Sequence, residues 1–164
     1  MNKAAMDKLV FFEGKKLRPE LLDQDARRWA GCLVLSEDKT DKKGKSFVNY
    51  HGVSRHQLRR LYDEVKHYQK LLEDKKKLYP KEKDRGWDEV KPLVKMVRAK
   101  TAYMVARMKD KEKNFKTKAA YDSLYNFIDQ SLNLIDEESH FNAFCLFFEA
   151  VYGFYYHLGG ASTK

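Results

Sequence analysis

The sequence has few residues that break regular structure and few that bind metals. Its 164 residues include only 3 prolines and 8 glycines, too few for an architecture of many short strands and tight turns. The two cysteines, Cys32 and Cys145, lie far apart in apolar surroundings, and no Cys-x-x-Cys or Cys/His cluster contains either of them. This usage is typical of two buried, reduced thiols in a cytoplasmic protein, so we predict no disulfide, no metal site and no cofactor.

Long apolar runs and a secretory leader are also missing. Residues 1–16 lack the apolar stretch and the small-residue cleavage site of a signal peptide. The most apolar segment, residues 141–158, is interrupted by Asn142, Glu149 and His157 and is rich in aromatic side chains. A membrane span needs roughly 20 apolar residues with few charges. We therefore expect a buried core helix in this segment and no membrane partner.

Positive charge is abundant and unevenly distributed. The formal net charge is +9, a balance that favours polyanionic partners such as nucleic acid or anionic lipid. Residues 1–118 contain 32 basic and 18 acidic residues, whereas residues 119–164 contain one basic and six acidic residues together with 11 of the 22 aromatics. The C-terminal part is thus expected to supply core, and the preceding part the positive surface.

Apolar residues recur at helical spacing along most of the chain, which predicts an all-α, single-domain bundle of about five helices over residues 1–164. The first 50 residues are the least regular part, and the charged segment 36–50, which contains Gly44, is expected to be an exposed, mobile loop. No strand pair is predicted. A short helix is expected over residues 4–13 and longer helices over residues 19–35, 54–79, 87–109, 117–136 and 139–158.

Two of these helices have distinctive features. Ser54 and Gln57 form a capping-box pattern, in which the Ser54 hydroxyl accepts a hydrogen bond from the third helical amide and Gln57 reaches back to the Ser54 amide. The last helix is apolar nearly all round, so either its own bundle or another subunit must surround it.

Basic residues form rows on the two middle helices. Rows of this kind suit the repeated phosphates of a nucleic-acid strand, and a nearby tyrosine can stack on a base or ribose. From spacing alone they fit a solvated helix face equally well, because acidic residues share the same helices. The rows are Arg55, Arg59, Lys66 and Lys70; Lys91, Lys95 and Arg98; and Lys100, Tyr103 and Arg107.

No pattern of catalytic residues is evident. The chain lacks a P-loop, a Gly-x-Gly-x-x-Gly loop, a His-Glu-x-x-His motif and a nucleophile motif. Arg60 and His67 have a spacing that resembles the loose Arg-x(4–6)-His motif of helical HEPN ribonucleases. Such a spacing is common by chance in a chain rich in basic residues, and Leu61 replaces the polar residue that usually follows the arginine. We therefore predict that the protein is not an enzyme.

Three segments together resemble a known family. The capped start of residues 52–62, the Lys-x-x-Tyr-x-x-x-Arg segment of residues 100–107 and the aromatic segment 143–160 with its final Gly-Gly are similar in order and spacing to the small subunit of Csm-type (type III-A) CRISPR effector complexes. The sequence departs from that family's pattern at His56, where serine is common, and at Arg60, where lysine is frequent.

The resemblance implies a non-catalytic helical bundle, several copies of which stack along the guide RNA and target RNA beside the backbone and other subunits of the complex. Self-association is therefore expected. Arg59, Arg60, Lys100 and Arg107 match basic motif positions, and Tyr103 is the tyrosine of the same motif. The helical wheel adds Arg55, Lys66, Lys95 and Arg98 as RNA-binding candidates. Two alternatives remain at this point: a helical scaffold with little RNA contact, whose apolar last helix docks on protein partners, and a ribonuclease that uses Arg60 and His67.

Overall fold

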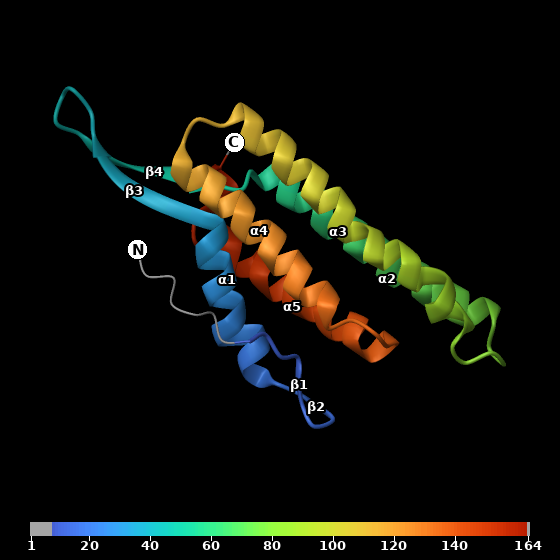
Figure 1. Cartoon of the computed structure of the whole chain (residues 1–164). Coiled ribbons are helices and arrows are strands. Elements are labelled where there is room, and N and C mark those ends of the chain that lie inside the picture. The colour runs from blue at the N-terminus through green and yellow to red at the C-terminus, as the bar shows by residue number, and fades with distance from the viewer. Residues whose placement is uncertain (1–7, 164) are drawn as a thin grey trace.

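The computed structural model describes residues 8–163 and confirms a mostly helical bundle (Figure 1). A π-helical turn, η1 (Leu21–Asp25), leads directly into α1 (Ala26–Leu33). The remaining helices are α2 (Arg55–Leu78), α3 (Arg85–Lys111), α4 (Phe115–Asn133) and α5 (Glu138–His157), and a 3-10 turn, η2 (Gly160–Ser162), follows α5. The expected boundaries of these four helices are correct to within about one turn.

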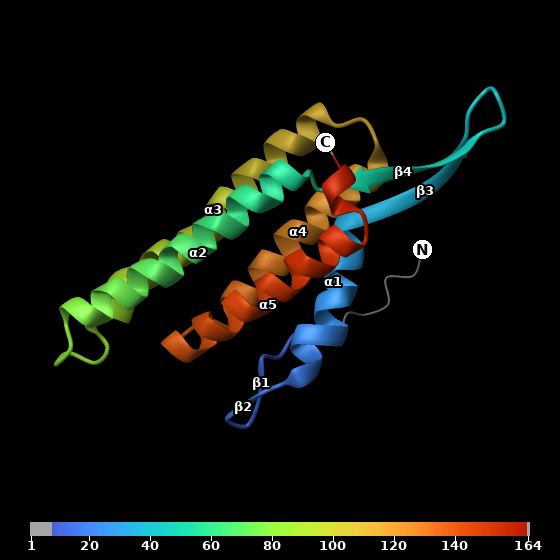
Figure 2. The ribbon, with the colours of Figure 1, turned by 180° about the vertical axis from the view of Figure 1, so that it is seen from behind.

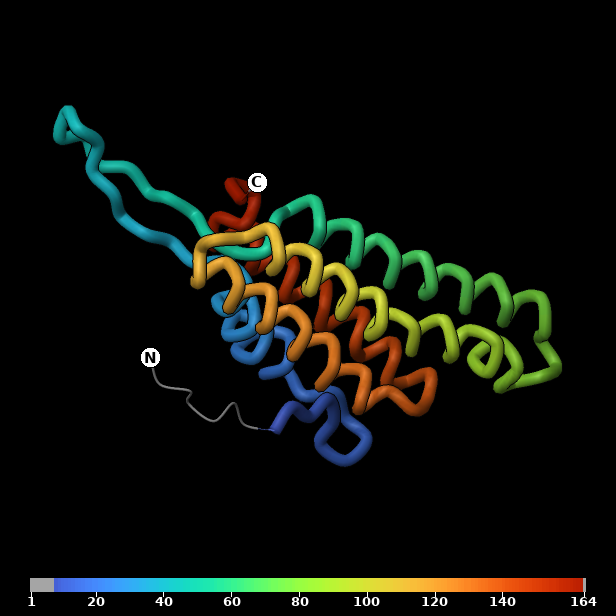
Figure 3. The backbone as a smooth tube through the Cα atoms, turned by 45° about the horizontal axis from the view of Figure 1, so that its top comes forward, coloured from blue at the N-terminus to red at the C-terminus, as the bar shows by residue number. Residues whose placement is uncertain are grey.

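The helices pack in two sets. The long helices α2 and α3 run side by side in opposite directions, α4 and α5 lie against one flank of this pair, and α1 packs on α4 and α5 beyond them (Figures 1 and 2). Helix α3 contacts α4, whereas α2 contacts α5, so the pair forms an outer layer with one face toward the rest of the bundle (Figure 3).

Aromatic side chains from α4 and α5 fill the interior. The Phe127 ring lies 5.3 Å from Phe147 and 5.4 Å from Phe148, centroid to centroid, and all three side chains are completely buried. Trp29 of α1 closes the cluster from the other side, 5.6 Å from Phe127. The bundle therefore covers most of the apolar surface of α5, as one of the two expectations for this helix had it, although Leu146, Tyr156 and the C-cap residue Leu158 remain exposed.

Polar contacts hold the start of α2 in place. The Ser54 hydroxyl accepts a hydrogen bond from the Gln57 amide, as expected for the N-cap. The predicted contact between the Gln57 side chain and the Ser54 amide is wrong. The Ser54 amide donates to the Tyr121 hydroxyl at 3.1 Å, and the Gln57 side chain lies 3.8 Å from the sulfur of Met108. A completely buried tyrosine from α4 thus replaces the glutamine as the acceptor for the Ser54 amide.

The segment over residues 36–50 is largely exposed, as expected, but it is regular hairpin and not an irregular loop. Strands β3 (Val34–Thr40) and β4 (Ser46–Gly52) form an antiparallel hairpin that projects from the bundle (Figure 1). Its outer part has solvent on both sides, so it lacks the apolar alternation that marks a half-buried strand. The expected helix over residues 4–13 is also absent from residue 8 onward, where β1 (Phe12–Glu13) pairs with β2 (Lys16–Leu17); residues 1–7 lie outside the described part of the chain.

Candidate nucleic-acid interface

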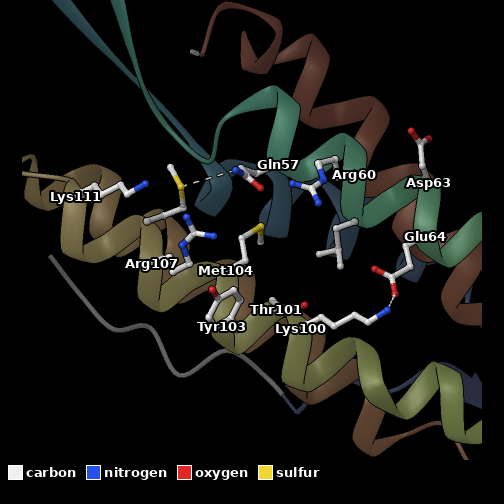
Figure 4. A pocket seen from close by; sticks show the side chains of 12 residues that line it. Gln57, Arg60, Asp63, Glu64, Lys100, Thr101, Tyr103, Met104, Arg107 and Lys111 are labelled. Atoms are coloured by element: carbon white, nitrogen blue, oxygen red, sulfur yellow. Dashed lines mark hydrogen bonds and ion pairs between the residues drawn. The ribbon is translucent and has the colours of Figure 1, made fainter.

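A hollow of about 700 Å³ lies between the first half of α2 and the second half of α3 (Figure 4). The two helices have opposite directions, so the start of one faces the end of the other. This placement brings motif residues about 40 positions apart in the sequence into one site. The hollow is lined by Gln57, Arg60, Leu61, Asp63, Glu64, Lys100, Thr101, Tyr103, Met104, Arg107, Met108 and Lys111.

The hollow combines a charged rim with a largely apolar floor. Four cations, Arg60, Lys100, Arg107 and Lys111, line it together with two carboxylates, Asp63 and Glu64. Leu61, Met104 and Met108 contribute apolar surface between them. Thr101 adds no free hydroxyl, because its Oγ1 donates to the Val97 carbonyl oxygen at 2.8 Å. Excess positive charge above an apolar floor suits a ligand that has both anionic and flat apolar groups.

Three cations of the hollow and one aromatic ring are available for a ligand. Within residues 8–163, Arg60 and Lys111 are exposed and make no ion pair or hydrogen bond. The Arg107 guanidinium lies 5.5 Å from the centroid of the Tyr103 ring, and that ring is 64% exposed. A guanidinium beside an exposed aromatic ring can bind a phosphate while the ring packs on a neighbouring base or ribose.

Lys100 lies at the edge of the hollow and is already paired. Its ammonium group donates to a carboxylate oxygen of Glu64 and lies 3.1 Å from the Tyr68 hydroxyl. The hydrogen bond to Glu64 raises the pKa of Lys100 above its ordinary value. Because Glu64 neutralises this cation, Lys100 contributes less positive potential to the hollow than its position suggests.

The structure places two other candidates, Lys95 and Arg98, outside the hollow. The Lys95 ammonium donates to the carbonyl oxygens of Leu132 and Ile135, at 2.7 and 2.5 Å, where α4 ends. Burial lowers the pKa of Lys95, and the neighbouring Arg98 and Lys91 lower it further. The Arg98 guanidinium lies 2.9 Å from the carboxylate of Asp129. These contacts join α3 to α4, so the two side chains have a structural explanation.

The remaining candidates, Arg55, Arg59 and Lys66, also lie outside the hollow. Lys66 pairs with Glu149 of α5 at 3.0 Å. The Arg55 side chain donates to the Ala161 carbonyl oxygen at 3.1 Å, next to the C-terminal turn. Arg59 is 69% exposed and lies 3.6 Å from Asp63, one turn farther along α2. Of the predicted basic row on α2, Arg55 and Lys66 are engaged within the bundle and Arg59 pairs on the helix surface, whereas Arg60, which the motif match predicted, lines the hollow.

Of the twelve lining residues, the sequence identified Arg60, Lys100, Tyr103 and Arg107 as candidates; the eight that it missed include Gln57, Met104, Met108 and Lys111. Lys111 follows Arg107 by four positions on α3, so the row of Lys100, Tyr103 and Arg107 could have been extended to it. The two methionines continue the apolar stripe of α3 in the sequence, a pattern that indicates core residues. They are half-buried and thus serve both the helix pair and the floor of the hollow.

Residues 8–163 contain neither a group of metal-ligating side chains nor a helix that could span a membrane. No three histidine, cysteine, aspartate or glutamate side chains are grouped so that they could hold a metal ion. No helix there combines the length and apolarity that a bilayer crossing requires.

The fold and the hollow define a small helical protein with an open, basic site between two long helices. Comparison with known families agrees with the resemblance in its motifs: the chain matches the family model Csm2 Type III-A over residues 34–160. The chain belongs to this family, and so it is a Csm2-type small subunit of a type III-A CRISPR complex. The match begins at the first residue of β3 and therefore includes the hairpin. The same comparison found no match among curated proteins or solved structures.

Proposed function

We propose that this small subunit binds the backbone of the guide or target RNA in the hollow between α2 and α3, without sequence specificity and without catalysing a reaction. The observation that carries the proposal is the convergence of Arg60, Tyr103, Arg107 and Lys111 from two helices on one open site. Family membership supplies the setting, a complex with backbone and other subunits.

Charge and exposure support a backbone contact. Arg60, Arg107 and Lys111 have no carboxylate partner in the described chain, so a phosphate can bind them without displacing an internal ion pair. In an RNA-guided complex, base pairing between guide and target supplies the sequence specificity, so a subunit of this kind needs to recognise only shape and charge. Several such subunits side by side, in a filament along the RNA, would repeat the same contact.

The binding test uses a double variant, Arg60→Ala with Arg107→Ala. Each lost phosphate contact on a single strand lowers the slope of log affinity against log salt by about 0.7, so we expect the slope to fall by about 1.4 and affinity to drop for every RNA sequence. Fluorescence anisotropy with labelled RNA over a series of salt concentrations measures both quantities.

The matched control is Arg27→Ala with Arg85→Ala, which removes the same charge from exposed arginines outside the hollow. It should change the slope much less. Equal slopes for the two double variants, or a loss confined to one RNA sequence, would contradict the proposal. Loss of assembly into the complex with unchanged RNA binding would indicate the scaffold instead.

The ribonuclease alternative uses only one residue of the hollow. Arg60 lines the site, whereas His67 does not; it lies seven positions farther along α2, about 10 Å along the helix axis. Its imidazole lies 5.8 Å from the Tyr68 ring on the same helix. Incubation of the isolated protein with RNA, beside the His67→Ala variant, tests this alternative. RNA cleavage that the substitution abolishes would show that the protein is an enzyme.

A further inference from the structure

One end of the molecule has a high density of lysines. The hairpin turn between β3 and β4 and the turn between α3 and α4 lie at the same end of the bundle (Figures 1 and 3). Residues 39–45 contain four lysines and one acidic residue, and residues 109–118 contain five lysines and two acidic residues. Contacts between α4 and both strands hold the hairpin against α4, and Lys116 of α4 lies 3.8 Å from Glu37 of β3. We call these two segments the end surface.

The hairpin turn has a fixed shape. The Asp41 carboxylate accepts hydrogen bonds from the amides of Lys43 and Lys45, at 2.8 and 2.9 Å, and the Asp41 amide donates to the Lys45 carbonyl oxygen. Gly44 has a φ of +81°, a conformation that side chains disfavour. The lysine side chains take no part in these contacts. They are therefore displayed on a preformed turn, which lowers the entropic cost of binding.

The cations of the end surface are largely free of ion pairs. Lys42, Lys43 and Lys45 have no carboxylate partner within residues 8–163, and the same holds for Lys113. The nearby Glu112 carboxylate accepts hydrogen bonds from the backbone amides of Lys113 and Asn114, so it makes no ion pair with these lysines. Repulsion between unpaired like charges makes such a surface favourable for a polyanion.

Exposed aromatic rings lie among these lysines. Phe115, the first residue of α4, is 74% exposed, and Phe47 on β4 is 47% exposed. Phe115 follows Lys113 and precedes Lys116 in the sequence. Aromatic rings exposed within a lysine-rich surface are the combination that binds single-stranded nucleic acid, because phosphates meet the cations while bases stack on the rings.

The end surface continues from the hollow. Lys111 is the last residue of α3 and lines the hollow, and Lys113 and Phe115 follow it within four residues. Strands of seven residues at about 3.3 Å per residue extend the cationic tip roughly 20 Å from the bundle. A strand that leaves the hollow at Lys111 thus meets further positive charge along the end surface.

We propose that the end surface is a second RNA-binding site, which holds single-stranded RNA that extends beyond the hollow. The inference rests on the proposed function, since it takes the hollow as the first contact of the same strand. An acidic protein partner is a different explanation of the lysines, but it gives no reason for the exposed Phe115 ring beside them.

The test compares labelled oligouridine of about 10 and about 40 nucleotides. A short RNA occupies a single site, whereas a long RNA reaches both sites. The triple variant K42A/K43A/K45A keeps Asp41 and Gly44 and hence the turn. On long RNA its slope of log affinity against log salt should fall by about 2, and on short RNA it should bind nearly as the wild type does. Phe115→Ala should weaken long-RNA binding about fivefold with little change in slope.

The matched control is K77A/K81A/K83A, which removes three exposed lysines near the turn between α2 and α3. Circular dichroism checks that every variant is folded. Equal effects of the two triple variants on long RNA would overturn the proposal. It would also be overturned if K42A/K43A/K45A bound RNA normally but failed to enter the complex, because that result indicates a protein-docking surface. The double variant Arg60→Ala with Arg107→Ala tests the hollow separately: it should weaken short and long RNA alike, and no effect on short RNA would refute the proposed function itself.

Discussion

Lys95→Ala should destabilise the protein without weakening RNA binding. Lys95 was an RNA-binding candidate because of its position in a basic row, but its ammonium group caps the end of α4 through the carbonyl oxygens of Leu132 and Ile135. Carbonyl groups at a helix C-terminus have no partner within the helix, and a cation there also interacts favourably with the helix dipole. The substitution removes both effects.

The magnitude follows from these two contacts. A hydrogen bond to a charged group contributes about 1.5–3 kcal/mol when it is well shielded. The Lys95 side chain is only half-buried and water can replace part of each bond, so we expect a total loss of about 2 kcal/mol. For a chain of this size, that loss lowers the Tm by about 4–8 °C. Lys91→Ala is the matched control, since its ion pair with the exposed Asp136 should contribute less than about 1 kcal/mol.

Thermal unfolding followed by circular dichroism measures the first effect, and RNA titration over a salt series measures the second. Lys95→Met separates packing from hydrogen bonding, because it keeps the apolar stem and loses the ammonium group. A Tm of Lys95→Ala within 1 °C of the wild type would contradict the capping role, as would a fall of its salt slope equal to that of Arg107→Ala.

Three further predictions concern the buried side chains of Tyr155 and Cys145. The buried Tyr155 hydroxyl donates to the Val53 carbonyl oxygen at 2.6 Å, so Tyr155→Phe should lower the free energy of unfolding by about 1–2 kcal/mol in urea titrations; an unchanged midpoint would contradict this role. Burial also raises the pKa of Tyr155 to about 12, above the ordinary value of 10.0, so the folded state holds the phenol proton more tightly than the unfolded state does. The free energy of unfolding should therefore fall as pH rises from about 10 to 12, and it should fall less in Tyr155→Phe. Burial raises the pKa of Cys145 to about 12 as well, so its thiol should resist alkylation at pH 8 until the protein is unfolded, and rapid labelling of native protein would show that the helix opens.

The helices were predictable because their signals are local. Apolar spacing, the Ser54 cap and the prolines before α1 and after α2 lie within each segment, and the boundaries came out within about one turn. The hairpin was not predictable in the same way. Phe47 and Val48 are adjacent apolar residues on opposite faces of β4, and the polar residues Ser46 and Asn49 flank them, so no alternating pattern appears. Its stability comes from strand pairing and from α4, which are not visible in the segment itself.

The candidate site was only partly predictable for a related reason. A helical wheel identifies which cations share a face, but it does not show which distant carboxylates or carbonyl groups they meet. Lys66 pairs with Glu149, 83 residues away, and Arg98 lies beside Asp129. The tertiary packing of α3 against α4 and of α2 against α5 decides these pairings. The motif positions Arg60, Tyr103 and Arg107 converge on one hollow, whereas the residues added from the wheel lie outside it.

The most direct measurement is photo-crosslinking of the assembled complex to target RNA that contains 4-thiouridine, followed by identification of the crosslinked peptides. If the hollow holds the RNA backbone, crosslinks should map to residues 100–111 and to the start of α2, with Tyr103 as the leading position. Two results would contradict this RNA contact. One is that crosslinks are confined to α4, α5 or the ends of α2 and α3 near Pro80; the other is that neighbouring subunits crosslink to the RNA and this subunit does not.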